Sequence, residues 1–376
     1  MKYRKYKYLH ILWHDELKFN IPYVEMINLE EKYFNKDDHL FITPHKTVYE
    51  NLSKFSNIKL VKNGNLINRY GNVADWIFVH YISGCSAIKF LFTKKRYAKK
   101  VIMRSWGGNE LRPYISEPAQ SLKTKIAKLV RNAYAFLYHR IVKNFCVIGV
   151  ANIVDVLDVQ SVYGKEMRTY PISYGYTVNR EIDYEGIARN RQKNSAVKVL
   201  IGNSANSRNK HIEILDILSV YKNENIDIFL ILSYGAEKDY IDRVEQYAKS
   251  LFGDKVHFIK DFLSDEDYTR FISTIDIGII ADTSSRALGL LFRLCIFECK
   301  VYVERNGKIA SAIKYSDCQA NFIDTIASSG FNNFIQKNKV NLLRMKETFG
   351  EYKSNEEKCM EMKSLLDMLD SNKKGN

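Results

Sequence analysis

Short apolar runs alternate with longer amphipathic segments along the first half of the chain. The runs are rich in Val, Ile and Leu, which is typical of strands buried in a parallel sheet. We expect such strands at Tyr8–Trp13, His39–Thr43, Ile58–Val61, Trp76–Ile82, Val101–Met103, Val147–Ala151 and Arg168–Ser173. Helical spacing of apolar positions predicts helices at Pro22–Phe34, Val48–Phe55 and Leu122–Asn144. This alternation indicates parallel βαβ units, the organisation of an α/β protein.

The same alternation resumes after a polar segment at residues 177–195. Strands are expected at Val197–Ile201, Ile226–Leu232, Val256–Ile259, Asp276–Ala281 and Val301–Val303. Helices are expected at Ile212–Tyr221, Glu237–Leu251, Tyr268–Thr274 and Leu290–Cys299. A chain of 376 residues is long enough for two domains, and we place their boundary near residue 178. The domains are then 1–178 and 179–336, followed by a helix and tail, 337–376, whose end should fray.

The strand Val197–Ile201 leads through a loop of small polar residues into a helix. Gly202, Asn203 and Ser204 allow the backbone to turn sharply and to approach a ligand closely. The arrangement directs backbone N–H groups and the positive end of the helix dipole at one place. Arg208, Lys210 and His211, where the loop joins the helix, are expected to add charge there. We therefore expect a phosphate-binding loop. A plain turn capped by Asn or Ser has the same pattern and is the alternative.

A second polar loop, Thr283–Gly289, also runs from a strand into an apolar helix and is another candidate anion site. Asp265 and Asp267 have the spacing of an acidic motif that binds metal and nucleotide in some transferases. Ser264, three residues before Asp267, is typical of a capping box at a helix start. We therefore interpret these carboxylates as part of a helix cap.

Positive charge is concentrated in the first 150 residues, which hold 26 Lys and Arg against 11 Asp and Glu. The whole chain carries +14, so an anionic partner should meet the first half. With 46% hydrophobic residues the chain can bury large cores and should not be disordered. The cysteines lack zinc-ligand and CxxC spacing, which indicates a reducing, cytoplasmic location. No apolar segment approaches the roughly 18 residues of a membrane span, so any membrane contact should be peripheral.

The helix expected at Leu122–Asn144 has an apolar stripe beside many basic residues. Such a helix can lie on an anionic bilayer with its basic side chains near the headgroups. The alternative is a helix packed on the core with a solvated charged face. A second basic cluster in the same half favours the membrane and consists of Lys94, Lys95, Arg96, Lys99 and Lys100.

Four motifs resemble those of glycosyltransferase family 56, in matching order: Ser105–Gly108, Leu200–Ile212, Ser233–Gly235 and Arg286–Leu291. The family includes a transferase of 4-acetamido-4,6-dideoxygalactose that acts in enterobacterial common antigen synthesis. The resemblance implies a GT-B fold, in which two Rossmann-like domains face each other across a cleft. It implies a dTDP-sugar bound by the C-terminal domain and an undecaprenyl-diphosphate-linked acceptor bound by the N-terminal domain. It further implies action on the inner face of the cell membrane, without a metal or another cofactor.

The resemblance also implies site residues by position. Those expected to bind the donor are Gly202, Asn203, Ser204, Arg208, Asn209, Tyr234, Gly235, Arg286 and Gly289. Those expected on the acceptor side are Trp106, Gly107, Gly108 and Asn109. Asn109 stands where the family member has Asp, and Ala287 and Leu290 replace a Gly and a Thr of a family loop. These departures from the family leave the expected general activity unchanged, and they bear on which sugar the protein uses.

Glycosyl transfer needs a stabilised leaving diphosphate and often a base for the acceptor hydroxyl. Backbone amides at residues 202–204 suit the first role, as does the guanidinium of Arg208, which can bind phosphate oxygens bidentately. Asp15, just after the first strand, is the candidate base, and His14 is the second candidate. A helix cap or a solvated loop carboxylate is the alternative for Asp15.

Other functions fit part of the pattern. A GT-B transferase with another nucleotide sugar, UDP- or GDP-linked, would serve O-antigen or capsule assembly. A basic nucleic-acid-binding protein would explain the charge, but the chain lacks the pattern of a helix-turn-helix, RRM or zinc finger. A non-catalytic sensor would bind the donor without turnover.

Overall fold

The computed structural model describes residues 6–61, 70–72, 74–81, 95–105, 122–173, 182–189, 196–350 and 353–374. The chain forms two compact units, which are treated separately below. Unit 1 comprises residues 1–181 and 353–376, and unit 2 comprises residues 182–352. The division after Glu181 lies close to the expected boundary near residue 178. The return of the last residues to unit 1 was not expected.

Unit 1 is built on a sheet whose described strands all pair in parallel. They are β1 (Tyr6–Leu12), β2 (His39–Thr43), β3 (Ile58–Leu60), β4 (Ala74–His80), β5 (Val101–Arg104), β6 (Val147–Val150) and β7 (Thr169–Pro171). Their order in the sheet is β3-β2-β1-β4-β5-β6-β7. Chain direction across the sheet therefore reverses between β1 and β4. Parallel αβ sheets bind ligands at the carboxyl ends of the strands beside such a reversal.

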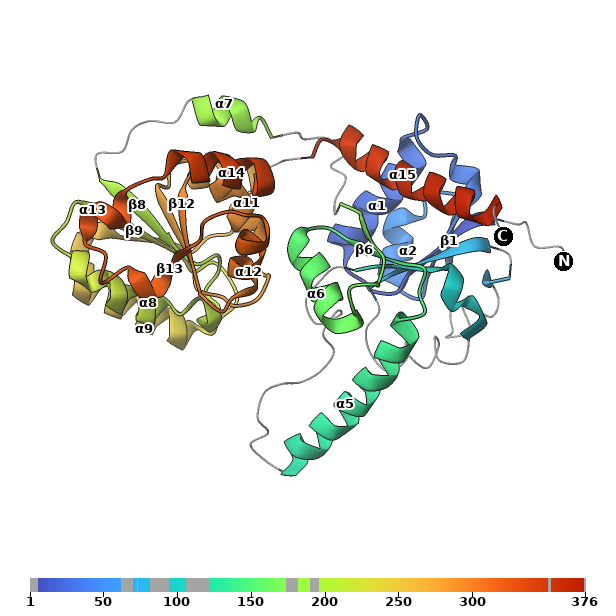
Figure 1. The fold of residues 1–376 in the computed structure, drawn as a ribbon, viewed down its shortest axis with the longest axis horizontal. Coiled ribbons are helices and arrows are strands. Elements are labelled where there is room, and N and C mark those ends of the chain that lie inside the picture. Colours follow the sequence, from blue (N-terminus) through green and yellow to red (C-terminus); the bar gives the residue numbers. More distant parts are fainter. Residues whose placement is uncertain are drawn as a thin grey trace. The chain divides into compact units, whose positions relative to one another are not determined.

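Helices cover both faces of this sheet (Figure 1). The described ones are α1 (Leu17–Leu29), α2 (Lys46–Leu52), α5 (Leu122–Val142), α6 (Ile153–Tyr163) and α15 (Asn355–Lys374), with 3₁₀ turns η1 (Lys36–Asp38) and η2 (Lys95–Lys100). On one face Leu9, Ile77 and Met103 pack with the end of α5 and with α6. On the other, Phe41 and Phe78 pack with α1 and α15.

The C-terminal helix α15 belongs to unit 1, whereas we expected a helix and tail that follow the second domain. One side of it enters the core of unit 1 and consists of Cys359, Met362, Leu365, Leu366 and Leu369. The hydroxyl of Tyr8, on β1, donates to Asp370 at 2.8 Å, and that of Tyr170, on β7, donates to Ser364 at 2.6 Å. The helix therefore completes one face of the first sheet.

Unit 2 is a second parallel sheet with the strand order of a Rossmann fold. Its strands are β8 (Val197–Ile201), β9 (Ile226–Ile231), β10 (Val256–Ile259), β11 (Ile277–Ile280), β12 (Lys300–Val303) and β13 (Asn321–Phe322). Their order is β10-β9-β8-β11-β12-β13, so the reversal lies between β8 and β11.

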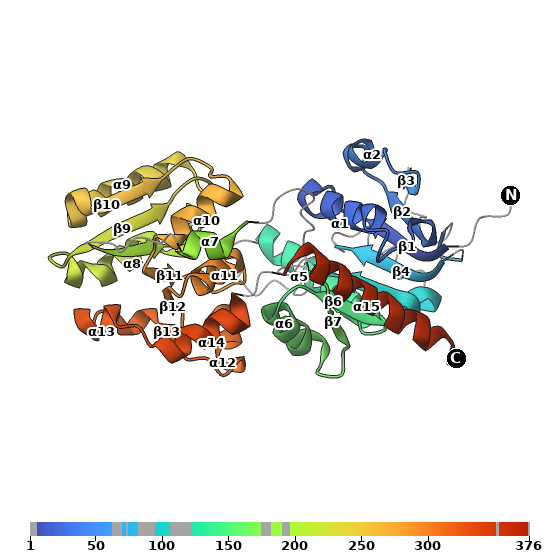
Figure 2. The same cartoon turned by 90° about the horizontal axis from the view of Figure 1, so that it is seen from above.

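The helices of unit 2 also lie on both faces of their sheet (Figure 2). They are α7 (Tyr184–Arg189), α8 (His211–Leu218), α9 (Lys238–Phe252), α10 (Asp265–Ser273), α11 (Leu288–Ile296), α12 (Lys308–Tyr315), α13 (Phe331–Ile335) and α14 (Lys339–Phe349). Short 3₁₀ turns are η4 (Ser207–Asn209), η5 (Ser219–Tyr221), η6 (Gly253–Lys255) and η7 (Ile323–Thr325). Residues Leu215, Val244 and Phe334 bring α8, α9 and α13 onto one face.

The expected strands match the observed ones within two residues at each end, whereas β13 was not expected and several helices differ. Helix α1 begins at Leu17 and holds Pro22 in its interior, although we expected it to begin at Pro22. Helix α6 was not among the expected helices, and its repeated valines are weak helix formers. It is capped by Asn152, whose side chain accepts from the Asp155 amide at 3.0 Å. The Ser264 hydroxyl accepts from the Asp267 amide at 3.1 Å, which confirms the cap of α10.

Three histidines are buried in the core of unit 1. His10 Nε2 lies 2.9 Å from His39 Nδ1, and His10 Nδ1 lies 3.5 Å from His80 Nε2. Burial lowers the pKa of His39 to about 3 and holds the pKa values of His10 and His80 well below the usual range. The nearby guanidinium of Arg104 acts in the same direction on His10 and His80. All three rings are therefore neutral at neutral pH.

Acid should destabilise unit 1 through these histidines. Their pKa values are lower in the folded chain, so the unfolded chain binds more protons once the pH falls below about 6.5. The free energy of unfolding should stay level above that pH. Below it, the free energy should fall with a slope approaching about 1.4 kcal/mol per pH unit for each buried histidine. Urea unfolding followed from neutral to mildly acidic pH measures this slope.

The replacement His39→Gln removes one of these protons, so it should lower the slope of the unfolding free energy against pH by about 1.4 kcal/mol per pH unit. His257→Gln is the matched control, because the side chain of His257 is 43% exposed. A free energy of unfolding that does not change over this pH range would contradict the burial of neutral histidines.

Candidate functional site

Four loops meet at the carboxyl edge of the second sheet, where the strand order reverses. They follow β8 (residues 202–210), β9 (232–237), β11 (281–287) and β12 (304–307). The amide of Ala205 donates to the Tyr234 carbonyl at 2.7 Å, which joins the first two loops. The amide of Lys308 donates to the Thr283 carbonyl at 3.0 Å, which joins the last two.

The loop after β8 is shaped by Gly202 and Asn209. Gly202 has φ +68°, and a Cβ atom on it would lie 2.7 Å from Asn209 Cγ, so only glycine fits without strain. Asn209 is buried, and its Nδ2 donates to the Ser204 carbonyl at 2.8 Å. Both residues therefore hold the loop, whereas we expected them to line the donor.

The amides of this loop are mostly engaged within the protein. The Gly202 amide donates to the Ile279 carbonyl at 3.0 Å and so extends the sheet. The amides of Asn206 and Arg208 donate to Ser204 Oγ at 3.4 Å and to Asn206 Oδ1 at 3.1 Å. The Gly202 amide therefore belongs to the strand ladder in this structure, and the expected phosphate contact at residues 202–204 stays a prediction.

An ion pair that the sequence did not suggest joins the loops on either side of β11. Lys210 Nζ contacts Glu304 Oε1, and these residues follow β8 and β12. Lys210 ends the first loop in a left-handed conformation, with φ 50° and ψ 45°. Asp282 is buried after β11 and accepts from the Ser284 amide at 2.7 Å. A carboxylate at a strand end was the available sequence signal for both acidic residues.

Two expected donor-binding arginines are exposed at this edge. Arg208 follows β8, and Arg286 lies in the loop after β11. Within the described part of the chain, no carboxylate pairs with either guanidinium. Both can therefore meet an anionic ligand, and both belong to loops beside the reversal of the strand order.

An aromatic pair lies where β9 and β10 end. Tyr234 is 53% exposed and Phe262 is 83% exposed. Their ring centroids are 6.4 Å apart. Gly235 has φ +96°, and a Cβ there would lie 3.6 Å from Ser204 Oγ, so this loop adjoins the loop after β8. The structure thus brings the expected residues Tyr234 and Gly235 beside Ser204, and it adds Phe262.

His211, the first residue of α8, is fully buried behind the loop after β8. Burial lowers its pKa to about 4, while the backbone of Ser204 acts weakly in the opposite direction. Its Nδ1 lies 3.1 Å from the Tyr240 hydroxyl. The ring is therefore neutral at neutral pH and contributes no charge to anion binding.

Two other expected donor residues differ in their surroundings. Asn203 is half-buried at the turn of the loop after β8. Gly289 lies in the first turn of α11, exposed, and the nearest atom to an added Cβ is Arg293 Nη1 at 3.7 Å. The structure shows no close approach that requires glycine at position 289.

His14 and Asp15 lie together at the carboxyl edge of the first sheet. His14 Nδ1 is 3.2 Å from Asp15 Oδ1, and the Asp15 side chain is 65% exposed. The His14 ring packs edge-on against Tyr81, with centroids 4.9 Å apart. Tyr81 follows β4, the neighbour of β1, so the three residues lie at the reversal of the first sheet. The sequence did not single out Tyr81.

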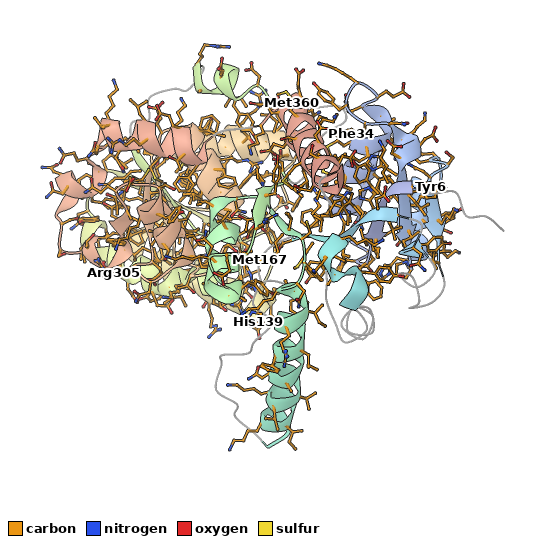
Figure 3. The ribbon with its side chains drawn as sticks, turned by 45° about the vertical axis from the view of Figure 1, so that its right-hand side comes forward. Tyr6, Phe34, His139, Met167, Arg305 and Met360 are labelled. Atoms are coloured by element: carbon orange, nitrogen blue, oxygen red, sulfur yellow. The ribbon has the colours of Figure 1, made fainter. Side chains whose placement is uncertain are left out.

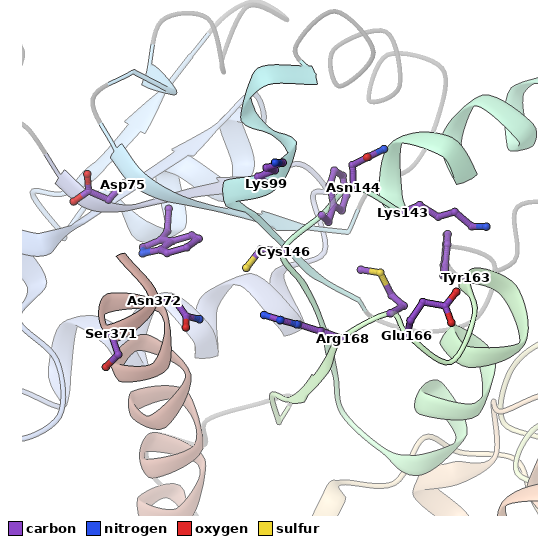
Figure 4. A pocket seen from close by; sticks show the side chains of 13 residues that line it. Asp75, Lys99, Lys143, Asn144, Cys146, Tyr163, Glu166, Arg168, Ser371 and Asn372 are labelled. Atoms are coloured by element: carbon purple, nitrogen blue, oxygen red, sulfur yellow. The ribbon is translucent and has the colours of Figure 1, made fainter. Parts of the chain in front are cut away.

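The expected acceptor-side residues Trp106, Gly107, Gly108 and Asn109 lie outside the described residues. A cavity of about 990 Å³ in unit 1 lies elsewhere (Figure 4). Its lining includes Asp75, Cys146 and Arg168, which lie near the amino ends of β4, β6 and β7. It contains none of the expected site residues, and it lies at the sheet edge opposite the one where α/β proteins bind ligands.

Residues 177–314 match the family model described as 4-alpha-L-fucosyltransferase, glycosyl transferase group 56. The match covers a little over a third of the chain and most of unit 2. It contains the loops after β8, β9, β11 and β12.

Solved structures share the fold over nearly the whole chain. A glycosyltransferase from Rickettsia africae has a TM-score of 0.60 at 13% identity, covering 98% of this chain and 99% of that one. Sucrose-phosphate synthase from Thermosynechococcus elongatus has 0.59 at 12%, covering 98% and 100%. Anabaena HepE in complex with UDP has 0.61 at 11%, covering 96% and 100%. The predicted fold class, GT-B with two Rossmann-like domains, is confirmed. With the family match, the fold supports a glycosyltransferase.

The two glycines expected at the donor site should respond differently to replacement. Gly202→Ala should destabilise the protein by about 1–3 kcal/mol, because it combines a left-handed φ with a clash against Asn209. Gly289→Ala is the matched control. It should be neutral or stabilise by up to about 1 kcal/mol, because it adds a helix-favouring residue in open space. Urea unfolding of both variants measures the difference, and equal stabilities would contradict the loop geometry.

Proposed function

We propose that this protein transfers a sugar from a nucleotide diphosphate held at the carboxyl edge of the second sheet. The observation that carries the proposal is the pair of exposed arginines, Arg208 and Arg286, on the two loops that flank the reversal between β8 and β11. Guanidinium groups bind phosphate oxygens bidentately, so they suit the diphosphate of the donor. The neighbouring aromatic pair Tyr234 and Phe262 offers exposed ring faces to a base or a sugar.

The donor that we propose is a dTDP-linked deoxy or acetamido sugar, 4-acetamido-4,6-dideoxygalactose in the first instance. The resemblance of the motifs at residues 200–212 and 286–291 supports this choice, as does the family match over residues 177–314. HepE, which shares the fold, binds UDP and glucose. A UDP- or GDP-linked sugar for O-antigen or capsule assembly is therefore the alternative.

We propose a saccharide linked to undecaprenyl diphosphate as the acceptor, met by the basic first half of the chain. The first 150 residues carry the excess positive charge, which suits a lipid diphosphate at an anionic membrane face. Among the described residues, no helix is both long enough and apolar enough to cross a membrane. We therefore propose peripheral contact with the inner face of the cell membrane.

In the proposed reaction the acceptor hydroxyl oxygen bonds to the anomeric carbon of the donor. The bond from that carbon to the diphosphate oxygen breaks, and the electron pair leaves with the nucleotide diphosphate. Arg208 and Arg286 stabilise the charge that develops on this leaving group. Asp15 accepts the proton of the acceptor hydroxyl. His14, whose Nδ1 lies 3.2 Å from Asp15 Oδ1 and accepts from the Glu16 amide at 3.3 Å, is the second candidate for this base.

Loss of one arginine should weaken nucleotide binding selectively. Arg208→Ala should raise the Kd for dTDP by about 10- to 100-fold, because it removes a charge-assisted hydrogen bond. Arg344→Ala is the matched control, since Arg344 is an exposed arginine on α14 of the same unit. Thermal shift with dTDP, UDP, GDP, ADP and CMP measures binding through the rise in melting temperature.

A rise with UDP or GDP alone would keep the site and change the donor. A folded protein whose melting temperature no nucleotide raises would contradict the proposed function. Equal dTDP shifts in the wild type and Arg208→Ala would contradict the role of Arg208.

Removal of the proposed base should slow turnover without affecting the donor. Asp15→Asn should lower kcat by about 100-fold or more, the usual contribution of a general base. The thermal shift with the nucleotide should stay at the wild-type value. Glu31→Gln is the control, because the Glu31 side chain is 76% exposed in the same unit. Full turnover by Asp15→Asn would rule out this base and direct attention to His14.

A further inference from the structure

Helix α5 has two parts with different surroundings. Its last two turns pack on the core of unit 1 through Ala135, Tyr138, Ile141 and Val142, which are at most 7% exposed. No residue from 125 to 133 whose side chain is described is buried. The first half of the helix accordingly projects from the other elements of unit 1, beyond His139 (Figure 3).

The projecting part carries large apolar side chains in contact with solvent. Ile126 is 57% exposed, Leu129 72%, Val130 62%, Phe136 54% and Leu137 39%. Spacings of three and four residues, through the exposed Ala133, place them on one face of the helix. We call these five residues the α5 apolar face. An exposed cluster of this kind marks an interaction site rather than ordinary surface.

The exposed face consists mostly of the apolar stripe that the sequence predicts for this helix. The sequence left open whether the apolar stripe packs on the core or lies on a membrane. The residues that pack on the core are mainly another set, centred on Ala135, Tyr138 and Val142. Among the members of the expected stripe whose side chains are described, only Ile141 is buried; the others are Ile126, Leu129, Ala133, Phe136 and Leu137. The stripe is therefore not what attaches the helix to the protein.

The charge of α5 indicates what covers the face. The helix Leu122–Val142 contains five basic residues and no acidic one. Lys125 is exposed beside the α5 apolar face, and Arg140 lies over the Phe136 ring at 5.8 Å. A small hollow of about 370 Å³ is lined by Lys125, Lys128, Leu129 and Asn132, which combines cationic and apolar groups at one place.

We propose that the α5 apolar face docks onto an anionic lipid bilayer. Its leucine, isoleucine and phenylalanine side chains enter the boundary between headgroups and acyl chains, and the lysines and Arg140 reach the lipid phosphates. A second copy of the chain fits this surface less well, because it would bring two purely basic helices together. The inference rests on α5 alone and does not depend on the donor or the acceptor proposed above.

Vesicle co-sedimentation of the full chain tests the proposal. The wild type should bind vesicles of phosphatidylglycerol and phosphatidylcholine, bind pure phosphatidylcholine weakly, and lose binding as salt rises. Leu129→Ser with Phe136→Ser should weaken partitioning about 10- to 100-fold, because two apolar side chains no longer leave water. Lys125→Gln with Arg140→Gln should weaken it about fivefold for each charge.

The matched control is Val340→Ser with Leu343→Ser on α14, where the side chains are 65% and 43% exposed. This control should bind the anionic vesicles as the wild type does. All variants should keep the wild-type melting temperature and its rise with nucleotide, since the changed residues are exposed and lie outside the donor loops. A lost nucleotide response would therefore count against the donor site and not against this surface.

Three outcomes would overturn the proposal. The wild type could fail to bind phosphatidylglycerol vesicles, or the Leu129 and Phe136 variant could bind them equally well. Sedimentation could also show a wild-type dimer that this variant abolishes, which would assign the face to a second copy of the chain.

Discussion

The reversal of strand order between β8 and β11 decides where the loops of unit 2 come together. Parallel pairing of Ile201 with Ile279, continued by the Gly202 amide, ends two neighbouring strands at one edge. The chain leaves these strands toward helices on opposite faces of the sheet, so the loops separate and leave room between them. The pair Lys210 and Glu304, which joins the loops after β8 and β12 across β11, follows from this topology.

The first sheet also has a reversal of strand order, but the side chains at its carboxyl edge are of other kinds than those of unit 2. Its reversal, between β1 and β4, gathers a carboxylate, an imidazole and a phenol ring (Asp15, His14 and Tyr81), where unit 2 gathers guanidinium groups. Glycosyl transfer needs an anion-binding group and often a base, and under the proposed function Arg208 and Arg286 of unit 2 take the first role and Asp15 of unit 1 the second. Helix α15 supports unit 1 by closing the face on which the buried histidines lie.

The strands and the fold class could be predicted because β-branched runs buried on both faces are a local signal. The sequence also located the loop after β8, but it did not show which residues of this loop hold its shape and which are exposed to a ligand. Whether Gly202 and Asn209 bind a ligand or hold the loop depends on the ladder contact with Ile279, which is not local. The partner of α15 is likewise remote in sequence, although Met362, Leu365 and Leu369 have helical spacing. On α5, spacing revealed an apolar stripe, but only the tertiary structure shows that most of it faces solvent.

Hydrogen–deuterium exchange of the full chain, with and without dTDP, shows where the nucleotide binds. We expect it at the carboxyl edge of the second sheet, on the loops after β8, β9 and β11. Binding there predicts slower exchange at residues 202–210, 233–237 and 282–288, with little change in the strands themselves. Protection confined to unit 1, or protection at the amino ends of the second sheet, would contradict it.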